Sequence, residues 1–540
     1  MQKRLLFLLA LLMTFMSSAM AQVTTSSLSG TVVADGEEVI GATVDVVHKP
    51  SGTHYRAVTN DKGVYTINGM RVGGPYEVTV RCIGFAEQKT GGINLQLGET
   101  FNLKTTLSET AKEMQEVMVS AKGSKFSYER TGASTNISNE QMIAMPTVSR
   151  NVTDFTRLSP YGGNGMTFQG SDGRTANFTV DGANFNNNFG LSSTLPGGGN
   201  PISMEAIEEL QVVISPFDVR QTGFIGGALN AITKSGTNTF KGQAYVYHQN
   251  ENMRGDAVDR EFISGSRDRD RTTTYGFSLA GPIIKNKLFF FVNGELIKSP
   301  GTGTPWRATE NGVGNADAYQ SYTTIADMER VQEHVARKYG YNTGSFTSFP
   351  ADADNKKLLA KITWNINDKN RLDVRYNYTT NSSWVMPNAS SMDGGTRSAF
   401  SRTSLYSMPF ANSMYSLEKN VHSVSLDLNT RLSNSLSNQF LATFSKIDDV
   451  RGSNSAEFPF IDIQDGTSTN TQYMSLGYEL FSYNNAVHNN IFNLKDELIY
   501  TTGRHKITGG VSYEYQMADN QYMRNGTGYY RYGSVDEFIN

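Results

Sequence analysis

The side chains that most often carry catalysis or bind metals are few and scattered in this sequence. It has seven histidines and a single cysteine, Cys82. None of the spacings His-Glu-x-x-His, Gly-x-Ser-x-Gly or Gly-Lys-Ser/Thr occurs, so hydrolase and nucleotide-binding motifs are missing. His48 and His54 have no neighbouring carboxylate and are predicted to lie on the surface, since a zinc site needs about four convergent ligands. We therefore expect no catalytic residue, no cofactor and no metal ligand.

Two charged stretches are typical of exposed loops, and only the first of them is a candidate for calcium binding. Asp352 and Asp354 alternate in a polar segment, but calcium prefers roughly six or more oxygen ligands. The run Arg267–Arg271 alternates arginine with aspartate and largely balances its charge. We expect neither stretch to hold a metal ion.

Glycine and asparagine form the most distinctive local pattern. They gather in Phe178–Asn184, in Gly197–Asn200 and in Gly226–Asn238. Glycine at this density lets backbones approach closely, so this part of the chain could be packed inside another structure. Between these stretches, the sequence predicts a helix over Ile202–Leu210 and a strand over Gln211–Ile214.

The segment before the glycine-rich region has the pattern of a small β-sandwich. Tyr76, Val78, Val80 and Cys82 alternate with polar residues, which predicts strands with one buried face and places Cys82 inward. Dipeptides such as Asp35-Gly36 and Asn68-Gly69 supply turns between short strands. Several short strands with regular turns are typical of a sandwich, here over 28–107.

The second half of the chain predicts long antiparallel hairpins with one apolar and one polar face. Ile362 and Trp364 alternate with Lys361, and beyond a turn Val374 alternates with Arg375. Short turns near 282–287, 367–370, 433–435 and 501–506 alternate with long loops. This sorting is typical of bacterial outer-membrane barrels, in which apolar residues face lipid and the charged set faces the lumen.

The first residues indicate that the protein is exported, and the composition excludes some classes of protein. Lys3 and Arg4 precede an apolar stretch, Leu5–Met16, and Ala19-Met20-Ala21 is a cleavage site, which predicts a signal peptide over 1–21. The net charge is −3, so the basic surface typical of nucleic-acid binding is missing. Only 38% of residues are hydrophobic, which excludes a bundle of membrane-spanning helices but not a barrel.

Two regions resemble known families. Leu28–Val33, Gly41–Val44, Asp61–Ile67 and Gly84-Phe85 together resemble the carboxypeptidase regulatory-like domain, a sandwich without catalytic residues of its own. The glycine-rich region, followed by the hairpins, resembles the plug and barrel of TonB-dependent outer-membrane receptors, and the leading sandwich points to their Oar-like branch. The plug resemblance rests on these residues: Asp181, Gly182, Gly226, Gly227, Asn230, Thr233, Lys234, Ser235 and Gly236.

The segment Glu113–Ala121, between sandwich and plug, has two interpretations. By its local sequence it is the last strand of the sandwich or the first of the next domain. The resemblance implies that it contacts TonB, and a short β-prone segment can add to a partner's sheet edge. The residues in that position are Glu116, Val117, Met118, Val119 and Ser120.

The whole sequence is therefore expected to form a mainly β protein with a sandwich over 28–107, an α+β plug over 131–237 and barrel strands over 240–540. Nine candidate strands cannot close a plugged barrel, which needs about 22, so we expect the N-terminal part of a longer protein.

The resemblance implies an outer-membrane transporter whose plug is moved by TonB and its inner-membrane energising complex. Outer-membrane lipid, an unknown external substrate and a surface lipoprotein are the other candidate partners, and nucleic acid is not one. The alternative is a surface adhesion or scaffold protein without transport, which would not need a plug. A soluble carboxypeptidase is excluded because its zinc ligands are missing.

Overall fold

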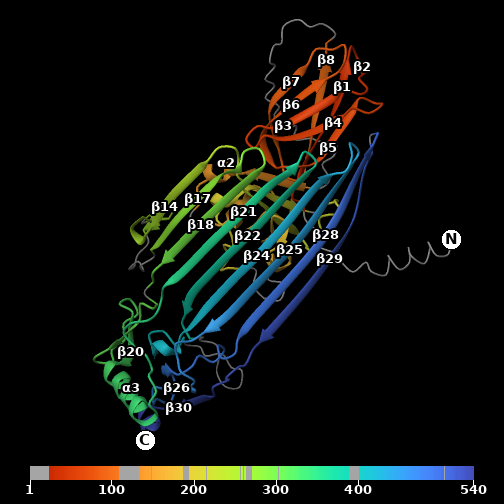
Figure 1. The fold of residues 1–540 in the computed structure, drawn as a ribbon. Coiled ribbons are helices and arrows are strands. Elements are labelled where there is room, and N and C mark those ends of the chain that lie inside the picture. The colour runs from red at the N-terminus through yellow and green to blue at the C-terminus, as the bar shows by residue number, and fades with distance from the viewer. Residues whose placement is uncertain are drawn as a thin grey trace, which may run out of the picture.

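A computed structural model describes residues 23–108, 133–147, 149–186, 194–214, 216–253, 255, 257–258, 261–262, 271–301, 303–387, 401–503 and 505–540. The described chain is mainly β, as the sequence predicts. A sandwich sits at one end of a broad curved sheet, a small sheet lies against that sheet's inner face, and folded loops gather at its far end (Figure 1). No helix of the described residues has the length and apolar character to cross a membrane.

The sandwich consists of two small sheets around one core. One sheet has the order β2-β1-β5 with β8 also on β1, and the other has the order β4-β3-β6-β7. Tyr76, Val78 and Val80 are buried in the core, while Cys82 is half-buried against its edge. Its strands are β1 (Ser26–Ala34), β2 (Glu37–Glu38), β3 (Thr43–His48), β4 (Thr53–Val58), β5 (Val64–Met70), β6 (Gly73–Arg81), β7 (Gln88–Leu95) and β8 (Thr100–Leu107).

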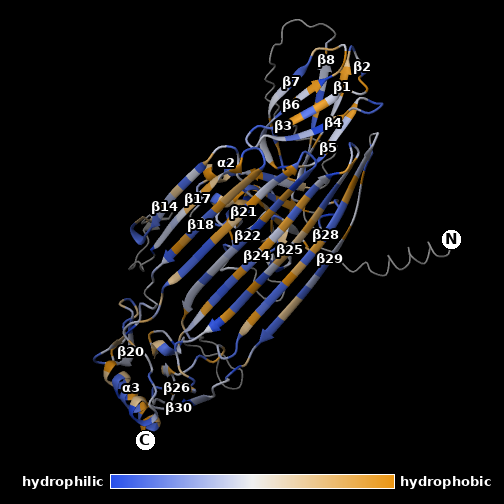
Figure 2. Ribbon diagram, viewed as in Figure 1, coloured by the Kyte–Doolittle hydropathy of each residue, from blue (hydrophilic) through white to orange (hydrophobic). Residues whose placement is uncertain are grey.

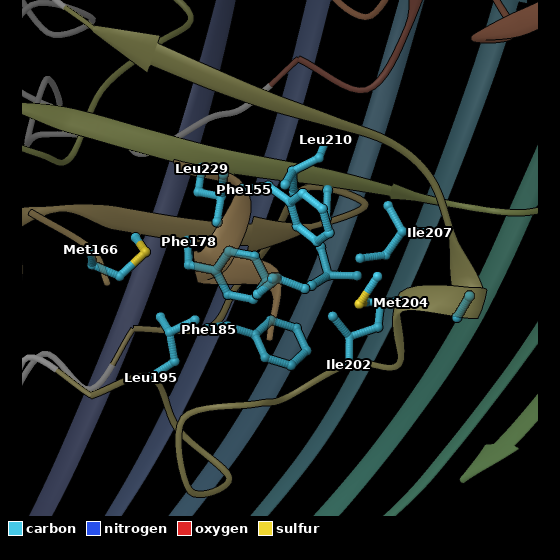
Figure 3. Packing of buried hydrophobic residues seen from close by; sticks show 14 of the residues in the cluster. Phe155, Met166, Phe178, Phe185, Leu195, Ile202, Met204, Ile207, Leu210 and Leu229 are labelled. Carbon is cyan, nitrogen blue, oxygen red and sulfur yellow. The ribbon is translucent and has the colours of Figure 1, made fainter. Parts of the chain in front are cut away.

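The glycine-rich region forms a second body, which we call the plug. Its sheet has the order β11-β10-β13-β12-β9, and Phe155, Phe178 and Phe185 are fully buried in its core (Figure 3). Its elements are β9 (Ala133–Ser138), α2 (Asn139–Ala144), η1 (Val152–Leu158), η2 (Gly173–Thr175), β10 (Asn177–Val180), β11 (Ala183–Asn184), η3 (Met204–Ala206), β12 (Ile207–Ile214) and β13 (Gly227–Thr233).

One local prediction for the plug is wrong. The segment predicted as a helix over Ile202–Leu210 contains only the short 3₁₀ turn η3, and the strand begins already at Ile207. The alanine, glutamates and leucine of this segment favour a helix locally. Pairing on both sides outweighs that preference, because β12 lies between β13 and β9 and is almost entirely buried.

The second half of the chain forms the broad sheet, which we call the wall. Among the described residues it is a nine-stranded sheet with the order β14-β17-β18-β21-β22-β24-β25-β28-β29, antiparallel throughout. The predicted hairpins are therefore correct. The strands are β14 (Lys241–Gln249), β17 (Thr272–Ile284), β18 (Leu288–Ser299), β21 (Ala353–Asn367), β22 (Asn370–Val385), β24 (Tyr415–Arg431), β25 (Leu436–Gly452), β28 (Ala486–Thr502) and β29 (His505–Gln521).

The strand register aligns outward-facing apolar or aromatic side chains in one row across the wall and inward-facing polar side chains in the next. An outward row runs through Tyr376, Val424, Phe444, Phe492 and Tyr515, which are all exposed. The neighbouring row faces the plug and runs through Arg375, Ser425, Thr443, Asn493 and Glu514, of which the first four are buried. Each strand consequently alternates between apolar and polar residues along its length (Figure 2). This is the predicted orientation, with the charged set turned inward.

At the wall's long-loop end, segments from several hairpins fold together into what we call the loop layer. Val335, Phe410, Ile463 and Phe538 are among the buried residues of its common core. Its elements are β19 (Arg307–Thr309), β20 (Gln320–Thr324), α3 (Ile325–Tyr339), β23 (Met408–Pro409), η6 (Ala411–Ser413), β26 (Phe460–Gln464), β27 (Gln472–Leu476), β30 (Tyr529–Tyr532) and α4 (Val535–Ile539). The remaining short elements are η4 (Glu251–Met253), β15 (Ala257–Val258) and β16 (Glu261–Phe262), which lie between β14 and β17.

Candidate functional site

Asp181 lies at the point where the plug meets the wall. It follows β10 in a tight turn with Gly182, and both residues have positive φ, 44° and 76°. Because Val180 pairs in parallel with Ala231, this turn brings the Asp181 carboxylate beside Thr233 at the end of β13. Thr233 donates its backbone N–H (2.9 Å) and its hydroxyl to the two carboxylate oxygens. The plug therefore holds this carboxylate in one orientation.

Two cations of the wall converge on the same carboxylate. The Lys361 Nζ atom on β21 and the Arg375 Nε atom on β22 each lie 3.4 Å from Asp181 Oδ2. Lys361 also donates to the Thr233 carbonyl (3.2 Å), and Arg375 donates to the hydroxyl of Ser425 (3.2 Å). Asp181, Lys361 and Arg375 are all buried. We call these three residues, with Thr233, the latch.

A second polar cluster joins the plug to β14, β18 and β21. The Ser203 hydroxyl on the plug is 3.0 Å from a carboxylate oxygen of Glu205 and 3.0 Å from one of Glu295. Each carboxylate has its own cation: Arg150 pairs with Glu205 within the plug, and Lys357 lies 2.7 Å from Glu295 within the wall. A single serine thus bridges two ion pairs that belong to different bodies.

A third contact lies near the far edge of the wall. Arg220 of the plug pairs with Asp218 beside it and reaches Glu497 on β28 at 3.4 Å. Lys495 lies 2.7 Å from the same glutamate. Charged side chains of β18, β21, β22 and β28 therefore meet the plug through ion pairs or hydrogen bonds.

The glycines of the expected plug pattern permit close packing. A Cβ at Gly227 would lie 2.6 Å from the Phe168 ring, and one at Gly236 would lie 2.4 Å from the Phe290 carbonyl oxygen of the wall. Gly226 has a positive φ of 91° and lies against Ser171. These positions exclude larger residues.

The other residues of the pattern are divided between the plug core and the wall contact. The Asn230 amide accepts a hydrogen bond from Thr179 at 2.9 Å inside the plug sheet. The Ser235 hydroxyl lies 3.3 Å from that of Thr363 on the wall. Lys234 lines a cavity, and burial is the main cause that lowers the pKa of its ammonium group.

That cavity, of about 450 Å³, lies where the plug, the wall and the sandwich meet. His48 and Arg71 of the sandwich, Lys234 of the plug and Arg371 of the wall are among its lining residues. His48 is buried, so the prediction that it lies on the surface is wrong; its ring packs against Tyr76 and its Nδ1 lies 2.6 Å from the Ser51 hydroxyl. Burial, with the nearby Arg71 and Arg371 charges, lowers the pKa of His48 to about 2.

The predicted TonB-contacting residues, Glu116, Val117, Met118, Val119 and Ser120, lie outside the described residues, as does the predicted signal peptide. Within the described ranges, no group of three or more histidine, cysteine, aspartate or glutamate residues could hold a metal ion. Sequence reasoning placed Asp181 and Thr233 in the plug but did not find their wall partners. The inward alternation of Lys361 and Arg375 was the available signal, although it does not say which plug residue they meet.

Comparison with known proteins agrees with this architecture. Residues 27–108 match the carboxypeptidase regulatory-like domain, and residues 232–537 match the outer membrane beta barrel domain. The chain is 24% identical over 387 residues to the TonB-dependent transporter Oar of Myxococcus xanthus, a match that covers 68% of this chain and 34% of that protein. The chain thus spans about a third of the length of the curated relative that it matches.

Among solved structures, similarity extends to the outer membrane transporter YddB of Escherichia coli, with a TM-score of 0.49 and 14% identity over 71% of this chain and 48% of that one. The siderophore receptor PirA of Pseudomonas aeruginosa gives a TM-score of 0.43 and 14% identity over 73% of this chain and 49% of that one. The barrel-domain match covers more than half of the sequence, from the end of β13 to α4. The chain therefore belongs to the outer membrane beta barrel domain family and is a homologue of the TonB-dependent transporter Oar.

Proposed function

We propose that the protein is a TonB-dependent outer-membrane transporter that imports an external substrate when TonB pulls on Glu116–Ser120. In this proposal, residues 1–21 are a signal peptide, and the sandwich and plug face the periplasm. The substrate binds at the long-loop end of the wall, where a surface lipoprotein is a further candidate partner. The homology to a protein named as a TonB-dependent transporter supports the general class.

The latch is the observation that carries the proposal. The plug has its own sheet and its own core, so it could move as one body. Ion pairs and hydrogen bonds connect the plug to the wall at several separate points, and their polar groups can be hydrated by water when the two bodies separate. Phe291, Leu359, Val421, Ile447 and Ile491 of the wall also pack against the plug core, so the plug is held firmly while no force acts. Both properties suit a plug that blocks the lumen at rest and leaves it when TonB pulls.

Blocking strand addition at the predicted TonB contact tests this proposal. Proline has no backbone N–H, so Val117→Pro should prevent pairing with a TonB strand, whereas Val117→Thr keeps the N–H and a β-branched shape. The cargo would first be identified by mass spectrometry of ligand that copurifies with the full-length protein. We expect Val117→Pro cells to bind that ligand at the surface without importing it, and Val117→Thr cells to do both. Normal import by the proline variant would contradict the assignment.

The loop layer keeps a second function open, that of a surface adhesion or scaffold protein. Its common core gives the long-loop end a defined shape, which an adhesive surface would also need. The same experiment separates the two functions, because adhesion would be unaffected by Val117→Pro and no import would be seen in any cells.

A further inference from the structure

The sandwich is fixed to the short-turn end of the wall at several separate points. The Asn365 amide on β21 donates to the Thr53 hydroxyl (2.8 Å), and Arg371 on β22 donates to the Tyr55 hydroxyl (3.1 Å). Further along, the Asn60 amide donates to the carbonyl of Gly503 in the turn between β28 and β29 (3.4 Å). These contacts reach from the middle of the wall to the last hairpin, and in Figure 1 the sandwich extends across the ends of these strands.

The sandwich also contacts the plug through the backbone of one residue, Leu97, and we call these contacts the Leu97 clamp. The Leu97 N–H donates to Glu209 Oε1 (2.8 Å), and the Leu97 carbonyl accepts from the side-chain amides of Gln211 (2.7 Å) and Asn136 (3.1 Å). Leu97 is fully buried. Glu209 and Gln211 lie on β12, while Asn136 lies on β9, so this clamp joins two neighbouring plug strands to the sandwich.

In the sequence, the predicted TonB-contacting segment connects the two parts that this clamp joins. It follows β8, which pairs with β1 at the edge of the sandwich, and precedes β9, which pairs with β12 at the edge of the plug sheet. Tension on the segment would therefore load β8 and β9 together. Peeling β9 from β12 would begin at Ala133, opposite Ile214, and would remove Asn136 from the clamp.

The cavity beside the latch is lined by the plug, the wall and the sandwich. The latch residues Thr233 and Lys361 form part of its lining, and His48, Pro50 and Arg71 of the sandwich form another part. Cargo that passed a displaced latch would enter this space and meet the sandwich.

We propose that the sandwich is a second closure of the lumen, which must detach from the wall before cargo can leave. This inference rests on the proposed function. In the proposed order, tension peels β9, the Leu97 clamp loses one of its three partners, and the sandwich then releases the hairpin ends.

A reversible crosslink between sandwich and wall tests the inference. Thr53→Cys and Asn365→Cys, in a Cys82→Ser background of the full-length protein in cells, can be joined by oxidation after assembly and freed by dithiothreitol. Externally added fluorescein maleimide is the probe for two steps. A third cysteine, Ser278→Cys in the cavity lining, reports displacement of the plug, and a cysteine-bearing reporter protein in the periplasm reports passage of the probe beyond the sandwich. Peptide mass spectrometry distinguishes labelling at position 278 from labelling of the reporter. The matched control is a crosslink within the sandwich, Val47→Cys with His54→Cys, between paired residues of β3 and β4.

We expect uncrosslinked cells with active TonB to label both position 278 and the reporter well above cells that lack TonB. Oxidation of the Thr53/Asn365 pair should reduce labelling of the reporter at least tenfold, and reduction should restore it, while the control crosslink should have no effect. Full labelling of the reporter with the sandwich locked to the wall would overturn the second closure but leave the transporter assignment intact. Equal labelling with and without TonB in uncrosslinked cells would instead refute plug displacement, and the second closure with it.

Discussion

Removal of the Asp181 carboxylate should weaken the hold of the wall on the plug by a predictable amount. Asp181→Ala leaves Lys361 and Arg375 buried without the anion that both contact, and it also leaves the Thr233 N–H without its acceptor. Breaking a buried ion pair by deleting one partner costs about 3–5 kcal/mol. With a urea dependence of about 1–1.5 kcal/mol per molar for a body of this size, the midpoint of plug release should fall by about 2–5 M.

The assay is urea titration of the purified full-length protein in detergent, with release followed by protease cleavage of the plug. Asp172→Ala is the matched control, because Asp172 pairs with Arg174 on the exposed surface of the same plug and should give no measurable shift. Adding Lys361→Met to Asp181→Ala removes one of the two stranded cations and should recover part of the loss. An unchanged midpoint for Asp181→Ala, or a double variant weaker than the single one, would refute the latch.

Three further predictions concern single positions. Burial raises the pKa of the Glu209 carboxyl to about 8 despite the N–H donated by Leu97. Docking of sandwich on plug should therefore be fully stable below pH 4.5 and weaken by about 1.4 kcal/mol per pH unit up to pH 8. Glu209→Gln should flatten the pH profile of protease access to the sandwich. Gly236→Val should prevent seating of the plug, since its Cβ would meet backbone oxygens of the wall, and single-channel recordings should then show open pores where the wild type shows none. Gly340 ends α3 with φ of 64°, so Gly340→Val should destabilise the loop layer by about 1–2 kcal/mol. Hydrogen exchange in α3 measures this loss, and an unchanged exchange rate would contradict the role of Gly340 as the C-cap.

The wall was the most predictable part of the structure, because period-two alternation and turn residues are local signals. Ile362 and Trp364 alternate with Lys361 along one strand, so the apolar pair and the lysine lie on opposite faces of the sheet and the lysine face is predicted to be turned inward. A register shift by one residue would have turned Lys361 outward. The helix α3 carried local signals as well. The Thr324 side chain caps its start by accepting the Asp327 N–H, Gly340 ends it, and its buried residues recur at helical spacing. This helix was not expected, because its residues lie in one of the long loops predicted between the hairpins.

The contacts between bodies could not be predicted from local patterns. Asp181 and Lys361 are 180 positions apart, and nothing near either residue specifies the other. The buried state of His48 has the same origin, since it depends on the packing of Tyr76 from a different strand. The wrong helix over Ile202–Leu210 shows the converse effect, in which strand partners on both sides decided the structure of a segment with helical residues.

The shared core of the loop layer limits how its parts can be varied. The Thr324 backbone N–H at the start of α3 donates to the Tyr473 hydroxyl of β27, and Arg330 pairs with Asp536 of α4. Three loops that leave different hairpins are thereby tied into one folded unit. Grafting a single loop from a relative would leave its neighbours with mismatched surfaces, so loop chimaeras should fold only when the whole set is exchanged together.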